Sequence, residues 1–203
     1  MLNGQKRGWQ VQGIEPSTEA AEHSRRLGLD VGSFFFSEKT ALNVGLFDAI
    51  NLSQVLEHVP APTALLKLVH SRLNQNGIIC IVVPNDFNPF QLILRDQLNF
   101  KPWWIAPPHH INYFDFSSVS KLVEGCGFEV IHQEVTFPID MFLLMGDNYI
   151  DHDNIGRQCH LRRKNFEQAL TNAGKAQLMR KIYEAFAKLG IGREIVLFAK
   201  KRE

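Results

Sequence analysis

Short apolar runs alternate with helix-period segments along this chain. Residues 9–14, WQVQGI, alternate apolar and polar positions and stop at the turn residues 15–17, which predicts a short strand followed by a turn. The next segment has a helical pattern that continues to about Leu27, with Gly28 as its stop signal. Strand therefore passes to helix through a tight turn, as in half of a βαβ unit.

Three further apolar runs in the first half of the chain predict strands, at residues 31–36, 47–52 and 78–83. Between the last two, residues 63–73 place Leu and Val at helical spacing, and the sequence NQNG at 74–77 is typical of a turn. The run IICIVV at 78–83 is continuous and β-branched, as in strands buried on both faces of a parallel sheet.

The second half contains an irregular segment, a helical segment and two more strands. Residues 86–116 are rich in Pro, Asn and aromatic residues and are predicted to pass over the top of the sheet. Ser117 is expected to cap a helix, and residues 128–137 alternate as a strand. Residues 138–190 are helical in pattern and precede a final strand at 194–200.

This alternation predicts a doubly wound α/β sheet with helices on both faces, in which ligands bind at the carboxyl ends of the strands. Four polar residues fall at such ends: Glu15, Ser53, Gln54 and Asn85. We expect a core at residues 1–137 with a cap excursion at 86–116, a helical insertion at 138–190 and the last core strand within 191–203.

Composition and net charge limit the classes of binding partner. The chain has 203 residues with 45% apolar and 21% charged residues, which fits one globular domain. A net charge of +1 provides no field to attract nucleic acid or an anionic membrane, so we expect a small-molecule partner. Three widely spaced cysteines indicate a reducing, cytoplasmic setting, and no apolar run is long enough to span a bilayer. Homo-oligomerisation stays open.

Three segments together resemble a known family. GWQVQGIEPS, then FDAINLSQVLEHVPAPTALLKLVHSRLNQNGIICIVVPN, then PPHHINYFDFSSVSKLVEGCGFEVI are similar to the small-molecule branch of the class I S-adenosylmethionine-dependent methyltransferases, which includes the ubiquinone-biosynthesis O-methyltransferases. The resemblance covers about residues 8–135 and recurs at the final strand. It implies S-adenosylmethionine as cofactor, methyl transfer to a sugar, quinone-precursor or natural-product oxygen, and a Rossmann-like sheet of order 3-2-1-4-5-7-6 with its last strand antiparallel.

Strand 1 of that order has no counterpart in this sequence. The GxGxG loop that follows strand 1 in the family would lie before Met1, and Gly4 and Gly8 do not rebuild it. We therefore expect a fragment or a mis-started reading frame, and the activity of the chain by itself is an open question.

The resemblance also assigns residues to the cofactor. Glu15 would accept hydrogen bonds from both ribose hydroxyls, with Pro16 beside the adenosine. Ser53, Gln54 and Val55 would surround the methionine end. The alternatives are a solvated acid before a helix N-terminus and an ordinary polar turn.

Histidines are the candidate bases. The resemblance places His110 on the substrate side of the sulfonium, where a neutral imidazole would remove the hydroxyl proton, and it places His58 near the cofactor pocket. His109 is a candidate substrate contact. Structural hydrogen bonding and loop packing are the alternatives for these histidines, and a metal is not expected, because no Asp, Glu or Cys cluster stands at ligand spacing.

Other residues would contact the substrate. Trp103 and Trp104 would line the pocket of a ring-bearing substrate; alternatively, they would pack a small lobe against the sheet. Asn85 would face the acceptor. Two other functions stay open: a nicotinamide-dependent oxidoreductase, and a non-catalytic module that keeps the fold. Titration with S-adenosylhomocysteine and with nicotinamide cofactor separates the three.

Overall fold

The computed structural model describes residues 1–202. The chain divides into two compact units, Met1–Leu46 and the part from Phe47 onward, which are described separately here. Within the described residues, no helix combines the length and the apolar character that crossing a bilayer requires.

The first unit contains a two-stranded parallel sheet. Its elements are α1 (Leu2–Gln5), β1 (Gln12–Ile14), α2 (Thr18–Arg26), β2 (Asp30–Gly32) and α3 (Glu38–Ala41). Strand β1 pairs in parallel with β2, and α2 connects them, as the βαβ pattern predicted. The hydroxyl of Ser17 caps α2 by accepting a hydrogen bond from the Ala20 N–H at 3.4 Å.

The predicted strand at residues 31–36 is wrong in its extent. The strand ends at Gly32, and residues 33–37 leave the sheet. The Phe34 ring folds back over Gly32, where a β-carbon would collide with it, and Phe35 is 75% exposed. The apolar run therefore reflects a local fold-back of one aromatic ring and not a longer strand.

The second unit contains a four-stranded mixed sheet, six α-helices and one 3₁₀ turn within the described residues. Its elements are β3 (Phe47–Ser53), the 3₁₀ turn η1 (Leu56–His58), α4 (Pro62–Arg72), β4 (Leu73–Pro84), α5 (Pro89–Leu98), α6 (Phe116–Glu124), β5 (Phe128–Val135), α7 (Asp140–Leu144), α8 (Asp153–Asn172), α9 (Ala176–Lys188) and β6 (Glu194–Lys201). The sheet order is β3-β4-β6-β5, with β3 and β4 parallel and β6 antiparallel to both of its neighbours. This arrangement confirms the expected order 4-5-7-6 with an antiparallel last strand.

Strand β4 begins earlier than predicted. It starts at Leu73, directly after α4, so the expected turn at 74–77 lies inside the strand. The register jumps there, since Phe47 pairs with Leu73 and Ala49 with Ile78. Asn76 has a left-handed φ of 63°, which Asn tolerates better than most residues. Residues 74–77, which were expected to form a turn, therefore form an irregular stretch within one continuous strand.

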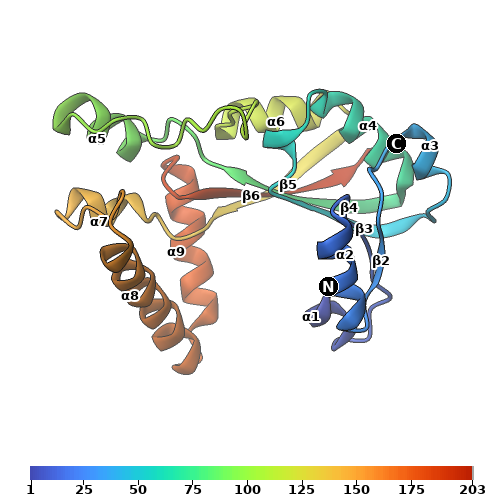
Figure 1. The fold of residues 1–203 in the computed structure, drawn as a ribbon, viewed down its shortest axis with the longest axis horizontal. Helices are drawn as coiled ribbons and strands as arrows, with labels where there is room; N and C mark the ends of the chain where they lie inside the picture. The colour runs from blue at the N-terminus through green and yellow to red at the C-terminus, as the bar shows by residue number, and fades with distance from the viewer. Residues whose placement is uncertain (203) are drawn as a thin grey trace. The chain divides into compact units, whose positions relative to one another are not determined.

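The core of this unit lies on one face of the sheet. Alternate side chains of β4 and β6 are fully buried: Ile79, Ile81, Val83, Ile195, Leu197 and Ala199. Figure 1 shows α4 and α6 on one side of the sheet and α9 on the other, which confirms helices on both faces. Burying a side chain of this size stabilises the fold by roughly 1.5–3 kcal/mol.

The N-cap of α6 is Asp115 and not Ser117. The Asp115 carboxylate accepts from the Ser118 N–H at 2.7 Å, and the Ser118 hydroxyl accepts from the Asp115 N–H at 2.9 Å. The bonds from Ser118 lower the pKa of Asp115, so this cap is strongest above the ordinary titration range of an aspartate.

We expect Asp115→Ala to lower the free energy of unfolding by about 1 kcal/mol at neutral pH, because the first turn of α6 loses its cap. Urea unfolding followed by circular dichroism measures the change. Ser117→Ala is the matched control, since the Ser117 side chain is exposed and takes no part in the cap. An equal loss of unfolding free energy in both variants would show that the capping box does not contribute to stability.

Candidate active site

The carboxyl ends of β3 and β4 lie side by side. Ser53 pairs with Val82, and the Gln54 N–H donates to the Val82 carbonyl at 2.9 Å. Gln54 adopts a left-handed φ of 55°, which for a residue of this type stores strain of about 1–3 kcal/mol. Its side-chain amide donates to Glu194 Oε1 at 3.3 Å. The turn after β3 is therefore held from two sides, with Ser53 and Gln54 exposed and Val55 half-buried.

The loop before α6 is fixed onto η1. The backbone N–H groups of Ile111 and Asn112 donate to the Glu57 carbonyl at 2.9 and 3.2 Å. The Asn112 side-chain amide donates to the carbonyls of Leu56 and Val59 at 2.9 and 2.7 Å. These four bonds bring the HH dipeptide of the loop beside the LEH turn, although the two lie far apart in the sequence.

Glu57 is buried in this junction without a hydrogen-bond partner. Its side chain is 0% exposed, and neither carboxylate oxygen has a partner within residues 1–202. Burial raises the pKa of Glu57, and the neighbouring His58 and His110 act in the opposite direction. An unsatisfied buried carboxylate is costly, so this group favours a nearby proton or positive charge.

His58 and His110 complete the junction. Their rings meet edge to face with centroids 4.9 Å apart, and His58 Nε2 lies 3.8 Å from Glu57 Oε1. His58 Nδ1 donates to the His109 carbonyl at 2.7 Å. Because a carbonyl only accepts, the proton of a neutral His58 sits on Nδ1 and Nε2 carries the free lone pair. The ring nitrogen Nδ1 of His110 is buried, with no partner in the described chain.

We call Glu57, His58 and His110 the acid–base cluster. One ligating or proton-binding atom from each lies within 4.8 Å of the others. The His109 side chain is exposed, and only its carbonyl takes part, through His58. The arrangement suits proton transfer, since one buried acid faces two imidazoles, the side chains that most often act as general acids and bases in enzymes.

A second buried acid, Asp86, follows β4. Its carboxylate accepts from the Phe114 N–H at 3.1 Å, and its own N–H donates to the Phe114 carbonyl at 2.8 Å. Burial raises the pKa of Asp86 to about 6, with a further contribution from the charge of Glu57. Asp86 therefore ties the loop before α6 to the end of β4 and titrates near neutral pH.

Asn85 and the tryptophan pair have defined packing roles. The Asn85 amide donates to the carbonyls of Gly190 and Gly192 at 2.9 and 3.1 Å, so both of its protons bond to the loop before β6. Trp104 is 8% exposed and meets Trp103 edge to face at 5.0 Å. Its indole Nε1 is buried without a hydrogen-bond partner in the described chain. Whether these three residues contact substrate stays a prediction.

In the first unit, Glu15 stands at the carboxyl end of β1. Its N–H donates to the Gly32 carbonyl at 3.0 Å, and its Oε1 accepts from the Ser17 N–H at 2.8 Å. The side chain is half-buried, and Pro16 beside it is exposed. One carboxylate oxygen is thus fixed by the turn, which leaves Oε2 available for a hydroxyl donor.

Sequence comparison gives the family. The family model described as "Methyltransferase domain" matches residues 1–133, which include the acid–base cluster, Asp86 and Glu15. The chain belongs to the methyltransferase domain family. A search of curated proteins finds no match.

Solved structures share the fold of this methyltransferase. An S-adenosylmethionine-dependent methyltransferase from Archaeoglobus fulgidus is 15% identical, with a TM-score of 0.61 over 98% of this chain and 80% of that one. A mycolic acid cyclopropane synthase complexed with S-adenosylhomocysteine is also 15% identical, with a TM-score of 0.57 over 99% of this chain and 73% of that one. A Burkholderia thailandensis 1,6-didemethyltoxoflavin N1-methyltransferase is 13% identical, with a TM-score of 0.50 over 100% and 65% of the two chains. Identities this low establish the fold alone.

S-adenosylmethionine is the cofactor that the sequence resemblance implies for this methyltransferase. The donor set fits this group, because the cofactor has ribose hydroxyls to donate and carries positive charge on its sulfonium and ammonium. Glu15 offers a free carboxylate oxygen to a ribose hydroxyl.

Neither Glu57 nor Asp86 was selected as a site residue from the sequence, although the resemblance places Glu57 with His58 near the cofactor pocket. Both stand next to residues that were predicted, His58 and Asn85, yet nothing in their spacing shows that they are buried. For Glu57 the available signal was its place beside His58, and for Asp86 it was its place two positions after the apolar strand that ends at Pro84. Burial depends on the loop before α6, whose docking on η1 through Asn112 the sequence does not indicate.

Proposed function

We propose that this methyltransferase transfers the methyl group to a hydroxyl oxygen of a small molecule, with the acid–base cluster removing the hydroxyl proton. The observation that carries the proposal is the partnerless His110 Nδ1 beside the buried, unsatisfied Glu57. An oxygen nucleophile must lose its proton as it attacks, whereas an amine can attack through its lone pair and lose the proton afterwards. A base held at the acceptor side therefore favours a hydroxyl substrate.

Bound S-adenosylmethionine supplies an electrophilic methyl group. His110 would accept the hydroxyl proton, and its imidazolium would form beside the Glu57 carboxylate, which stabilises the charge. The His109 carbonyl accepts the Nδ1 proton of His58, and His58 Nε2 faces Glu57. Because the His58 side chain is 44% exposed, His58 would pass the hydroxyl proton from the acid–base cluster to solvent.

The remaining assignments complete the proposal. Ser53, Gln54 and Val55 would contact the methionine end of the cofactor, and the strained backbone at Gln54 supports a functional constraint there. The buried, unpaired Nε1 of Trp104 supports a role for Trp103 and Trp104 beside a ring-bearing acceptor. A quinone-precursor, sugar or natural-product hydroxyl, a cytoplasmic location and a homo-oligomer belong to the same proposal.

The test is methyl transfer from S-adenosylmethionine carrying a labelled methyl group to a panel of small phenols, catechols and sugars, each matched with the corresponding amine. The proposal expects labelled methyl ethers, with transfer to hydroxyl acceptors exceeding transfer to the matched amines. Preferential labelling of the amines would contradict the assignment of oxygen. Saturable binding of S-adenosylhomocysteine by calorimetry, measured in parallel, establishes that the cofactor site is competent in the protein used.

We expect Glu15→Gln to weaken S-adenosylhomocysteine binding by about tenfold, because a neutral amide replaces a charge-assisted acceptor for the ribose. Calorimetric titration measures the dissociation constant. Glu19→Gln is the matched control, since Glu19 is an exposed acid in the first turn of α2, only four positions along the chain. If both variants bind as the unchanged protein does, Glu15 is only a solvated turn acid.

A further inference from the structure

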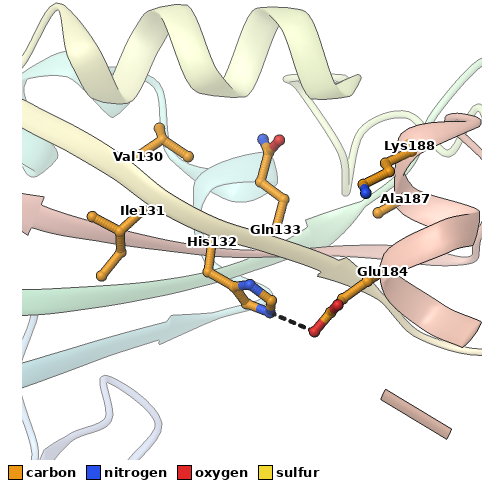
Figure 2. A pocket seen from close by; sticks show the side chains of 7 residues that line it. All are labelled: Val130, Ile131, His132, Gln133, Glu184, Ala187 and Lys188. Atoms are coloured by element: carbon orange, nitrogen blue, oxygen red, sulfur yellow. Dashed lines mark ion pairs between the residues drawn. The ribbon is translucent and has the colours of Figure 1, made fainter. Parts of the chain in front are cut away.

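A second cluster of ligating side chains lies away from the acid–base cluster, where α9 packs on β5. It consists of His132 and Glu134 on β5 and Glu184 on α9, with one ligating atom of each within 4.8 Å of the others. His132 and Glu134 are two positions apart on a strand and therefore point to the same side of the sheet. Figure 2 shows His132 and Glu184 pointing toward one another from the strand and the helix, while Gln133 projects to the opposite side.

The spacing of the three side chains matches a metal site. His132 Nε2 lies 3.5 Å from Glu134 Oε2 and 3.9 Å from Glu184 Oε1. Ligands at about 2.0–2.2 Å from a tetrahedral zinc ion are separated by about 3.4 Å, so a small movement of the half-exposed Glu184 completes the geometry. One imidazole and two carboxylates form a mixed donor set of a kind that zinc accepts.

Three further observations favour a cation here. Glu134 Oε2 is buried and has no hydrogen-bond partner in residues 1–202. Because the Glu134 side chain is only 15% exposed, water cannot easily replace the missing partner. The His132 ring rests against Phe198 with centroids 5.8 Å apart, which limits its rotation. A neighbouring cavity of about 340 Å³, lined in part by His132 and Glu184, has room for a water molecule as the fourth ligand.

Arg180 is the resident competitor for this position. Its Nε lies 3.8 Å from Glu134 Oε2, beyond hydrogen-bond distance, and its side chain is 65% exposed. A long exposed guanidinium at this distance gains little from the pair and can move into solvent. A divalent ion that bonds directly to Glu134 would therefore displace it.

We propose that His132, Glu134 and Glu184 bind one divalent transition-metal ion, zinc being the best match, which joins α9 to the sheet. The site lies outside the acid–base cluster and goes beyond the methyl-transfer proposal. By linking a strand to a helix of the segment before β6, the ion would stabilise the folded state in proportion to its occupancy.

The experiment is calorimetric titration of tag-free, chelator-treated protein with zinc chloride. We expect one saturable site that weakens at least tenfold in His132→Asn and in Glu184→Gln, both of which alter half-exposed side chains and leave the core intact. Arg180→Ala should bind zinc more tightly, since the competing guanidinium is gone. If the three side chains form only an ion-pair network with Arg180 and bind no metal, the variant should show no gain in zinc affinity.

His110→Asn is the control, because it alters the other group of His and Glu side chains and should leave this affinity unchanged. Loss of zinc binding in His110→Asn with normal binding in His132→Asn would overturn the proposal, as would the absence of saturable binding in the unchanged protein. Methyl-transfer activity is not part of the readout, so the outcome is independent of the proposed function.

Discussion

Replacing His110 with asparagine is expected to lower kcat for methyl transfer to a hydroxyl acceptor by about 10²- to 10⁴-fold, the usual contribution of a general base. The imidazole is the group of the acid–base cluster whose Nδ1 is buried and uncommitted, and asparagine retains hydrogen-bonding groups of similar size without accepting a proton. The affinity for S-adenosylhomocysteine should change little, because the loss lies in the proton-transfer step.

Two measurements separate this role from a structural one. The pH profile of kcat should lose its acidic limb in His110→Asn, and an acceptor with a more acidic hydroxyl should recover part of the rate, since it needs less help from a base. His109→Asn is the matched control, because its side chain is exposed. Equal losses in the two variants, or a pH profile of unchanged shape, would mean that His110 only packs the loop.

Asp86→Asn is expected to raise the free energy of unfolding at neutral pH by up to about 3 kcal/mol, on the basis of 1.36 kcal/mol per unit of pKa difference. The pKa of Asp86 rises from its ordinary value of 3.8 to about 6 on folding, chiefly through burial. The folded state therefore binds more protons than the unfolded state between these values, and stability falls as pH rises through that window. Asparagine is neutral throughout, and its amide oxygen can still accept from the Phe114 N–H.

Urea unfolding from pH 4 to pH 8 measures this effect. The unchanged protein should lose stability across pH 4 to 6 relative to Asp86→Asn, and the curves should run parallel above that range. Asp96→Asn is the control, since Asp96 is an exposed partner of Arg95 and its replacement should leave the stability at pH 7 nearly unchanged. A variant that is less stable than the unchanged protein at pH 7 would show that the Asp86 charge is stabilising.

Periodicity predicted the strands of the sheet well because their burial is dictated locally. The run IICIVV lies in the central strand β4, and EIVLFAK lies in β6, whose alternate residues are fully buried. The order of β3, β4, β6 and β5 came from the family resemblance and not from the pattern itself. Local patterns cannot show which strands pair, since pairing depends on contacts distant in sequence.

The misses have identifiable physical causes. The apolar residues around Phe34 predicted a longer strand, but in the structure the Phe34 ring folds back over Gly32 and the strand ends there. Asp115 takes the cap of α6 that Ser117 was expected to form, because both residue types cap well and only geometry selects between them. The site histidines were predicted as separate candidates, whereas the hydrogen bonds of Asn112 to the LEH turn make them one cluster.

The two bonds from the Asn85 side chain have a consequence for how the enzyme can vary. They fasten the tip of β4, next to the reactive groups, to the glycine loop where the helical segment re-enters the sheet. We therefore expect a change in the length of α8 or α9 to leave the end of β4 and the start of β6 in place, because the Asn85 side chain joins the two.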